Sequence, residues 1–401
     1  MHRQAVIWSK IKRNIIRNHA SKINVVIGGI TLKKIRIAFV CMLCFILFLA
    51  TGCSDTVKID LSSLGKEDVN NIPLDYKNVL SYTAFVDGNI VYLNADELTA
   101  TYYKYSIVDG STIELGTIDN FYLSAKNSVL IKDKLYLFAS VIENDDTINA
   151  LCQIDLTNNT ITQYSNADRS LAGISAYEYD GNIVTLKNKV SGNVITTFLE
   201  TFDISTNEWS IETTNSFNTD TNIGSAIYAL YGNQNTLCVL HDECSGKDNI
   251  HTTLKFYDGT FKEIKSVELS QDIKDFIMGS RIIEIAAFGD YIYLNNISNK
   301  AVLGEIVGNE LVPKLMEANL ELALNQTDTK NPLFYIRRSN RCFLLDSTGE
   351  LVSVDLNIKN DYSIMCILSD GNSIVLICYA DDKPDCIYQI NMDSLKSVVI
   401  Q

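Results

Sequence analysis

From Leu80 to the end of the chain, short apolar runs alternate with short polar segments. Each run is about the length of one strand and rich in β-branched or aromatic residues, which indicates strands rather than helices. Most runs follow a polar turn such as Asp87-Gly88-Asn89, because Asp-Gly and Gly-Asn pairs reach the positive φ of tight hairpins. The clearest runs are Ile90-Val91-Tyr92-Leu93, Leu135-Tyr136-Leu137-Phe138, Ile183-Val184-Thr185-Leu186, Leu237-Cys238-Val239-Leu240, Tyr291-Ile292-Tyr293-Leu294, Cys342-Phe343-Leu344-Leu345 and Ile374-Val375-Leu376-Ile377. The pattern predicts an all-β domain.

A second hairpin signal follows each run at a nearly regular interval. It begins at residues 109, 157, 205, 258, 308, 347 and 393, with separations of 48, 48, 53, 50, 39 and 46 residues. Repeats of about 40 to 50 residues, each with about four strands, are typical of β-propeller blades. We predict a β-propeller with seven blades of four antiparallel strands. Six or eight blades remain alternatives, because the segment around residues 317–330 resembles an insertion and the sixth repeat is short. A pair of β-sandwiches fits the regular spacing less well.

The repeats also define how the turns are expected to fall. In the sixth repeat the first turn is placed at Ser339-Asn340, and the seventh repeat ends on the turn Asp393-Ser394. The repeated unit, with second strands such as Tyr105-Ser106-Ile107-Val108-Asp109, resembles the loose repeats of bacterial lipoproteins that carry a β-propeller domain. The resemblance covers residues 80–401. It includes no WD dipeptide, kelch double glycine or sialidase Asp-box, so it implies a fold and no particular ligand.

The first 52 residues differ sharply from the rest, since they contain nine Lys or Arg and no Asp or Glu. This one-sided charge marks a targeting segment. The uncharged stretch 37–52 follows Arg36 and is 16 residues long. A membrane-spanning helix needs about 20 apolar residues, so the stretch favours a signal peptide. Residues 1–31 are unusually long for such a segment, and we interpret them as an artefact of the assigned translation start.

The signal segment ends in Leu49-Ala50-Thr51-Gly52-Cys53, which resembles the lipobox of bacterial lipoproteins, with Ala50 where Leu is usual. The resemblance implies that the Cys53 thiol receives a diacylglyceryl group, that cleavage follows Gly52, and that acyl chains such as palmitate anchor the protein to the membrane. Two or three chains anchor firmly, since each buried methylene contributes about 0.8 kcal/mol. An uncleaved transmembrane anchor is the alternative. Both place the remainder outside the cytoplasm, at the cell membrane.

These observations divide the chain into three segments: the N-terminal extension and signal peptide (1–52), the lipidated Cys with a flexible tether (53–79), and the β-propeller domain (80–401).

Residues 53–401 contain 25 Lys and Arg against 48 Asp and Glu, a formal charge of −23. Such a surface repels nucleic acid, so we exclude nucleic acid as a partner. Solubility alone is a sufficient reason for the acidity.

The exported part has few residues suited to catalysis. It contains two histidines, His241 and His251, and no zinc-protease, nucleophile-elbow or phosphate-loop motif. Cys238, His241, Cys244 and His251 form a Cys-x2-His-x2-Cys-x6-His cluster of zinc donor types. Cys238 and His241 fall three residues apart on one expected strand and therefore on opposite faces. We favour no metal and no cofactor.

Seven cysteines besides Cys53 lie in the exported part, and an odd number cannot pair completely. Cys378 and Cys386 flank an acidic turn and are the best disulfide candidates, with Cys238 to Cys244 second. Most of the others lie in apolar runs, where a thiol acts as a small hydrophobic group.

Acidic clusters at 143–146, 242–243 and 381–385 are interpreted as hydrated turns, although calcium or a two-carboxylate glycosidase also uses such groups. Tyr102, Tyr103, Tyr177, Tyr179 and Trp209 are expected to fill the packing between blades rather than to stack on sugars.

The function that fits best is a non-catalytic binding or scaffold propeller for a protein, peptide or glycan. Alternatives are a carboxylate-dependent carbohydrate-active enzyme and a sensory or assembly subunit of a membrane complex.

Overall fold

The structure is a computed structural model that describes residues 56–61, 79–96, 99–124, 128–143, 146–165, 177–233, 236–246, 249–277, 280, 282–324, 331–358, 362–380 and 386–399. The chain forms two compact units, Met1–Ser54 and Asp55–Gln401, and every described residue belongs to the second. The Leu49 to Cys53 lipobox therefore lies outside the described residues.

The described strands fall in chain order into seven groups, which we call blades 1 to 7. Blade 1 comprises β2 (Val79–Val86), β3 (Asn89–Asp96), β4 (Thr99–Ser106) and β5 (Thr112–Asp119). Blade 2 comprises β6 (Phe121–Ser124), β7 (Val129–Ile131), β8 (Lys134–Glu143), β9 (Asp146–Asp155) and β10 (Thr160–Ser165). Blade 3 comprises β11 (Tyr177–Tyr179), β12 (Asn182–Ser191), β13 (Val194–Asp203) and β14 (Glu208–Asn218).

Blades 4 and 5 continue the same pattern of four antiparallel strands. Blade 4 comprises β15 (Ile223–Asn233), β16 (Thr236–Ser245), β17 (Ile250–Tyr257) and β18 (Glu263–Leu269). Helix α3 (Gln271–Ile277) connects it to blade 5, which comprises β19 (Ile282–Phe288), β20 (Tyr291–Asn296), β21 (Lys300–Val307) and β22 (Glu310–Ala318). Blades 3, 4 and 5 share one hydrogen-bonded sheet only because β14–β15 and β18–β22 are linked through two residue pairs each.

The last two blades are shorter. Blade 6 comprises β23 (Leu320–Leu322), β24 (Leu333–Ile336), β25 (Arg341–Leu345) and β26 (Leu351–Asn357). Blade 7 comprises β27 (Ser363–Ser369), β28 (Ser373–Tyr379) and β29 (Cys386–Asn391), and helix α4 (Met392–Val399) follows it. Strand β1 (Val57–Asp60) pairs in parallel with β26 and adds a fifth strand to blade 6.

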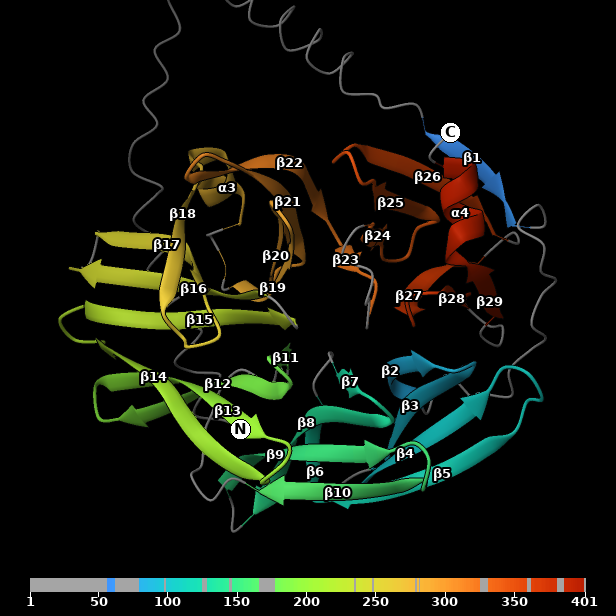
Figure 1. Cartoon of the computed structure of the whole chain (residues 1–401), viewed down its shortest axis with the longest axis horizontal. Helices are drawn as coiled ribbons and strands as arrows, with labels where there is room; N and C mark the ends of the chain where they lie inside the picture. The colour runs from blue at the N-terminus through green and yellow to red at the C-terminus, as the bar shows by residue number, and fades with distance from the viewer. Residues whose placement is uncertain are drawn as a thin grey trace, which may run out of the picture. The chain divides into compact units, whose positions relative to one another are not determined.

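Strands of successive blades contact one another, and the last blade contacts the first. β7 contacts β11, β11 contacts β15, β15 contacts β19, and β27 contacts β2. The blades therefore follow one another around a common centre (Figure 1). Large buried side chains such as Phe202, Tyr293 and Phe334 fill the space between them. The fold is all-β and a β-propeller, so the predicted fold class is confirmed.

Two predicted features of the late repeats are wrong. Ser339-Asn340 connects β24 to β25, the second and third strands of blade 6, rather than the first and second. The first strand of blade 6, β23, lies in the segment 317–330 that was expected to be an insertion. The sequence does not reveal this strand, because a strand of three residues is too short to give a clear apolar run. Asp393-Ser394 is not a hairpin but part of α4, where Asp393 occupies the first helical turn.

The expectation that order begins near Leu80 is wrong for β1. Val57 to Asp60 pair with Val354 to Asn357, and Ile59 and Leu61 are buried in the cluster that joins blades 6 and 7. Four residues with two apolar side chains give too weak a pattern to separate a strand from a polar tether.

Candidate functional site

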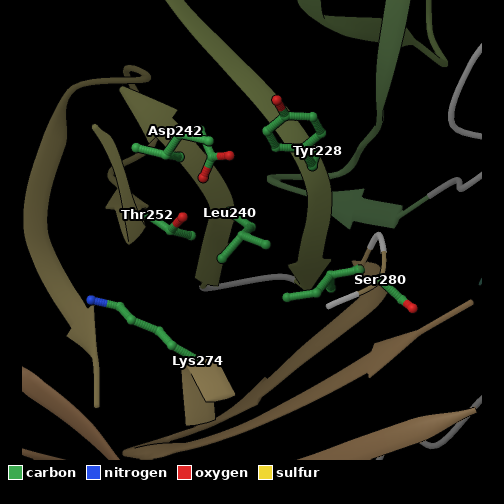
Figure 2. Close-up of a pocket in the computed structure, with 8 residues that line it drawn as sticks. Tyr228, Leu240, Asp242, Thr252, Lys274 and Ser280 are labelled. Atoms are coloured by element: carbon green, nitrogen blue, oxygen red, sulfur yellow. The ribbon is translucent and has the colours of Figure 1, made fainter. Parts of the chain in front are cut away.

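A pocket of about 520 Å³ lies between blades 4 and 5 (Figure 2). Its walls come from three strands of blade 4, from α3 with the residues that follow it, and from the first strand of blade 5. The lining residues are Tyr228, Leu240, Asp242, Ile250, Thr252, Lys274, Ser280 and Ile282. The volume falls within the range of about 300 to 1,000 Å³ that is usual for small-molecule sites.

The pocket opens at one end of the blades, which we call the connector face. Because neighbouring strands are antiparallel, the turn from second to third strand and the connector from fourth strand to the next blade lie at the same end. In blade 4 these are the β16–β17 turn and the α3 connector. The opposite end, with the first-to-second and third-to-fourth turns, is the hairpin face.

Strand alternation brings the polar and apolar lining residues of blade 4 together. Leu240 and Asp242 lie two residues apart on β16 and therefore share a face, and Asp242 is paired in register with Thr252 of β17. Tyr228 is the extra residue of a bulge in β15 between Ile227 and Ala229. A bulge re-aims the side chain that it carries, which explains how Tyr228 reaches the pocket.

Helix α3 closes one side of the pocket. Ile273 and Ile277 of α3 are buried and fix the helix against blade 5, and this places the neighbouring Lys274 at the pocket wall. Ser280 follows the helix, and its hydroxyl lies 2.7 Å from the hydroxyl of Ser298. The site therefore has an apolar base with hydroxyl, ammonium and carboxylate groups around it.

Asp242 is the most unusual of these groups, because it is only 8% exposed and its Oδ1 has no hydrogen-bond partner among the described residues. Burial raises the pKa of Asp242, whereas the hydrogen bond from the Thr252 hydroxyl and the charge of His251 lower it. A buried carboxylate oxygen without a partner is costly to the folded state. Such a group suits a ligand that supplies the missing donor.

Exposed aliphatic side chains occur at both ends of the blades, and one of them lines the pocket. Ile250 forms part of the lining and is 57% exposed, so the pocket is open to solvent there. Other large exposed side chains occupy strand ends or turns at the connector face of blades 3 to 5, namely Val190, Ile223, Ile283 and Ile297. Val108, Ile264 and Val307 are exposed at the hairpin face as well, so the exposed aliphatic side chains do not single out one face.

The predicted Cys and His cluster is divided between the two faces of β16 and β17. Cys238 and Cys244 share the face that packs toward blade 5, whereas His241 and Glu243 share the other face and His251 pairs in register with Glu243. Strand alternation therefore separates the two sulfurs from the two imidazoles. Among the described residues no group of three or more such side chains could hold a metal ion.

Both histidines have protein partners on their own face. The Nε2 of His241 lies 3.4 Å from the Oδ1 of Asn215, and burial, followed by the charge of Lys255, lowers the pKa of His241. The Nε2 of His251 lies 2.8 Å from a carboxylate oxygen of Glu268 at the surface. Neither histidine lines the pocket.

The two disulfide candidates differ in geometry. Cys378 and Cys386 are paired directly across β28 and β29, so the backbone brings them together, and their disulfide stays a prediction. Cys238 and Cys244 lie on the same strand, β16, six residues apart. That separation is about 20 Å in a strand, whereas a disulfide needs Cα atoms within about 7 Å, so this second pairing is wrong.

The buried thiols Cys152 and Cys238 behave as apolar core groups. Both are fully buried between blades, and burial raises the pKa of each to about 12. Aromatic residues that we considered for sugar stacking also pack internally. Trp209 contacts Phe138 and Phe202, and Tyr177 contacts Tyr231.

The acidic clusters do not form one site in the described chain. Asp242 and Glu243 belong to β16 rather than to a turn and point to opposite faces, with Glu243 exposed and bonded to Lys255 at 3.2 Å. Glu143 and Asp146 are paired across β8 and β9. Residues 144–145 and 381–385 lie outside the described residues.

Among the described helices, none has the length and apolar character needed to cross a membrane.

No family model and no curated protein matches the chain. Among solved structures, the β-propeller domain of the trilobed protease of Pyrococcus furiosus is 12% identical with a TM-score of 0.48, over 78% of this chain and 93% of that one. A catalytically inactive virginiamycin B lyase of Staphylococcus aureus, solved with quinupristin, is 15% identical with a TM-score of 0.47, over 80% and 98%.

The acylaminoacyl peptidase of Pyrococcus horikoshii is 12% identical with a TM-score of 0.49, and the match covers 84% of this chain but only 53% of that one. The chain thus spans about half the length of that peptidase. Likenesses at this level leave the activity of the chain open. The strand order and the contacts between blades define its class as a β-propeller.

Proposed function

We propose that the protein is a non-catalytic binding propeller that takes its ligand on the connector face of blades 4 and 5. The observation that carries this proposal is an open pocket of about 520 Å³ whose lining includes the exposed side chain of Ile250. Asp242 is the one carboxylate of its lining, whereas glycosidases work with a pair. The pocket therefore favours binding over the carbohydrate-active enzyme.

The cellular location of the protein is part of the same proposal. Cys53 carries the lipid, residues 1–52 are removed, and the propeller is held at the outer side of the cell membrane. The charge boundary at Cys53 supports it, since no acidic residue precedes Cys53 and the 48 acidic residues follow it. A ligand in that compartment is a protein, peptide or glycan of the envelope.

The test compares Ile250→Asp, on the connector face, with Val307→Asp, next to the turn after β21 on the hairpin face. Both side chains are 57% exposed, so each variant is expected to keep the thermal unfolding temperature of the wild type. Full-length protein is immobilised, exposed to an extract of its own cell envelope, and the retained material is quantified by mass spectrometry. We expect Ile250→Asp to lose a set of components that Val307→Asp keeps. Equal retention by all three proteins contradicts binding at the connector face.

A further inference from the structure

The pocket contains one strongly unsatisfied group, the carboxylate of Asp242. Its Oδ1 is buried and has no hydrogen-bond partner among the described residues. Thr252 is paired in register with Asp242, and its side chain lowers the pKa of this carboxyl. Figure 2 shows the carboxylate directed toward the space between Tyr228 and Leu240. The carboxylate thus faces the pocket while one of its oxygens has no donor among the described residues.

The described part of the chain supplies Asp242 with no ion pair. Lys274 lines the same pocket, but no salt bridge joins it to Asp242 among the described residues. The charge of His251 favours ionised Asp242, but His251 is bonded to Glu268. When Asp242 is ionised, its charge therefore has no ion-pair partner among the described residues.

We infer that the pocket recognises an aliphatic primary ammonium group, whose nitrogen binds the carboxylate of Asp242 and whose hydrocarbon chain lies against Leu240, Ile250 and Ile282. This inference rests on the proposed function, because it names the chemistry of the same site. An ammonium donates to a single oxygen as a compact charge. A guanidinium binds best to two oxygens at once, whereas the described residues leave a single Asp242 oxygen without a donor.

Other occupants fit the lining less well. Calcium takes six to eight oxygen ligands, typically including several carboxylates, and the pocket offers one carboxylate and the hydroxyls of Tyr228, Thr252 and Ser280. A neutral hydroxyl would satisfy Oδ1 but would leave the buried charge uncompensated. The apolar wall favours a ligand with a hydrocarbon chain behind its charge.

The test uses purified full-length protein in detergent micelles and isothermal titration calorimetry. The probes are hexylamine, hexanol and hexanoate, which share a chain and differ in charge. Charge-assisted hydrogen bonds are about twice as strong as neutral ones, so we expect hexylamine to bind at least about tenfold more tightly than hexanol. We expect hexanoate not to bind, and Asp242→Asn to reduce the amine preference to about one. The same titration into Glu263→Gln, which changes a carboxylate of blade 4 outside the lining, controls for partition into micelles.

Equal binding of hexylamine and hexanol by the wild type, or an amine preference that survives in Asp242→Asn, overturns the inference.

A further probe, Nα-acetyl-lysine methylamide, distinguishes the two possible sources of the ammonium group. Binding of this probe at least as tightly as hexylamine identifies a lysine side chain of a protein, whereas binding of hexylamine alone identifies a free amine. The inference and the proposed function fail separately, because loss of amine preference leaves the Ile250→Asp capture result unchanged.

Discussion

At the residue scale, Asp242 links the stability of the propeller to its binding site. Its negative charge is buried at a site where the protein gives one oxygen no hydrogen bond. Groups of this kind, whose pKa is shifted by burial, cluster at functional sites because the folded protein tolerates them only in return for a role. Asp242 therefore lowers the stability of the folded protein at a position where an apolar side chain would pack without that cost.

The first prediction is that Asp242→Asn stabilises the unliganded protein at neutral pH. Because burial raises the pKa of Asp242, the folded chain holds this proton more tightly than the unfolded chain. Stability contributed by Asp242 is therefore lost as the pH rises from the unfolded pKa through the folded pKa. We expect the variant to gain about 1 kcal/mol or more in the free energy of unfolding at about pH 7, with a smaller gain at about pH 4, by urea titration.

Asp258→Asn is the matched control with the opposite sign. The Thr260 hydroxyl and the backbone N–H groups of Lys262 and Thr260 lower the pKa of Asp258. Its contribution to stability is therefore present above the unfolded pKa and is lost as the pH falls through the folded pKa. The control variant should be less stable than the wild type at neutral pH. A loss of stability in Asp242→Asn as well would mean that Asp242 is held by bonds that the fold needs.

At the element scale, the third-to-fourth turns share a side-chain device. In five blades an Asp at or just after the end of the third strand accepts a hydrogen bond from the backbone N–H of the residue two positions later, which is Ser or Thr. These residues are Asp109, Asp155, Asp203, Asp258 and Asp346. The Asx geometry explains why the turns recur so regularly in the sequence. The sequence Asp-x-Ser or Asp-x-Thr is thus the signature of these third-to-fourth turns. Turn pairs such as Asp109-Gly110 include only part of it.

Strand β1 gives the second prediction, because it brings a distant segment onto the sixth blade. Ile59 is 2% exposed and packs in the cluster that contains Leu356 and Ile364. Truncation of such a buried side chain typically costs about 2 to 5 kcal/mol. We expect Ile59→Ala to lower the free energy of unfolding by about that amount, as measured by urea titration.

Lys58→Ala is the control for β1, since Lys58 is exposed on the same strand. Its effect should stay within about 0.5 kcal/mol. If Ile59→Ala is equally neutral, then β1 adds no stability, and residues 56–61 behave as the tether that the sequence alone predicts.

At the scale of the whole molecule, the sequence predicts repeats better than it predicts sites. Hairpin turns are local, so Asp87 and Asp180 with φ of 49° each confirm the expected positive φ of two first turns. The pocket depends on residues from five separate segments and on the packing of blade 4 against blade 5, which no local pattern encodes. One signal was available: Leu240, Asp242 and Cys244 alternate on one strand face, so a carboxylate is placed where the blade should be apolar.

The last prediction concerns the boundary at Cys53. If Cys53 is lipidated, cells fed an alkyne analogue of palmitate should produce a labelled protein, and Cys53→Ala should lose the label and leave a precursor that retains residues before Gly52. Two or three acyl chains hold a protein at a membrane far more firmly than one, so the wild type should remain with the membrane after a high-salt wash. The acidic propeller, with a formal charge of −23 after Cys53, is repelled by anionic lipid. Membrane retention of a wild-type protein that carries no label would instead point to an uncleaved apolar segment at 37–52 as the anchor. If the protein is anchored in either way, the connector face has to find its ligand within reach of the membrane, which limits the partners that the capture experiment should recover.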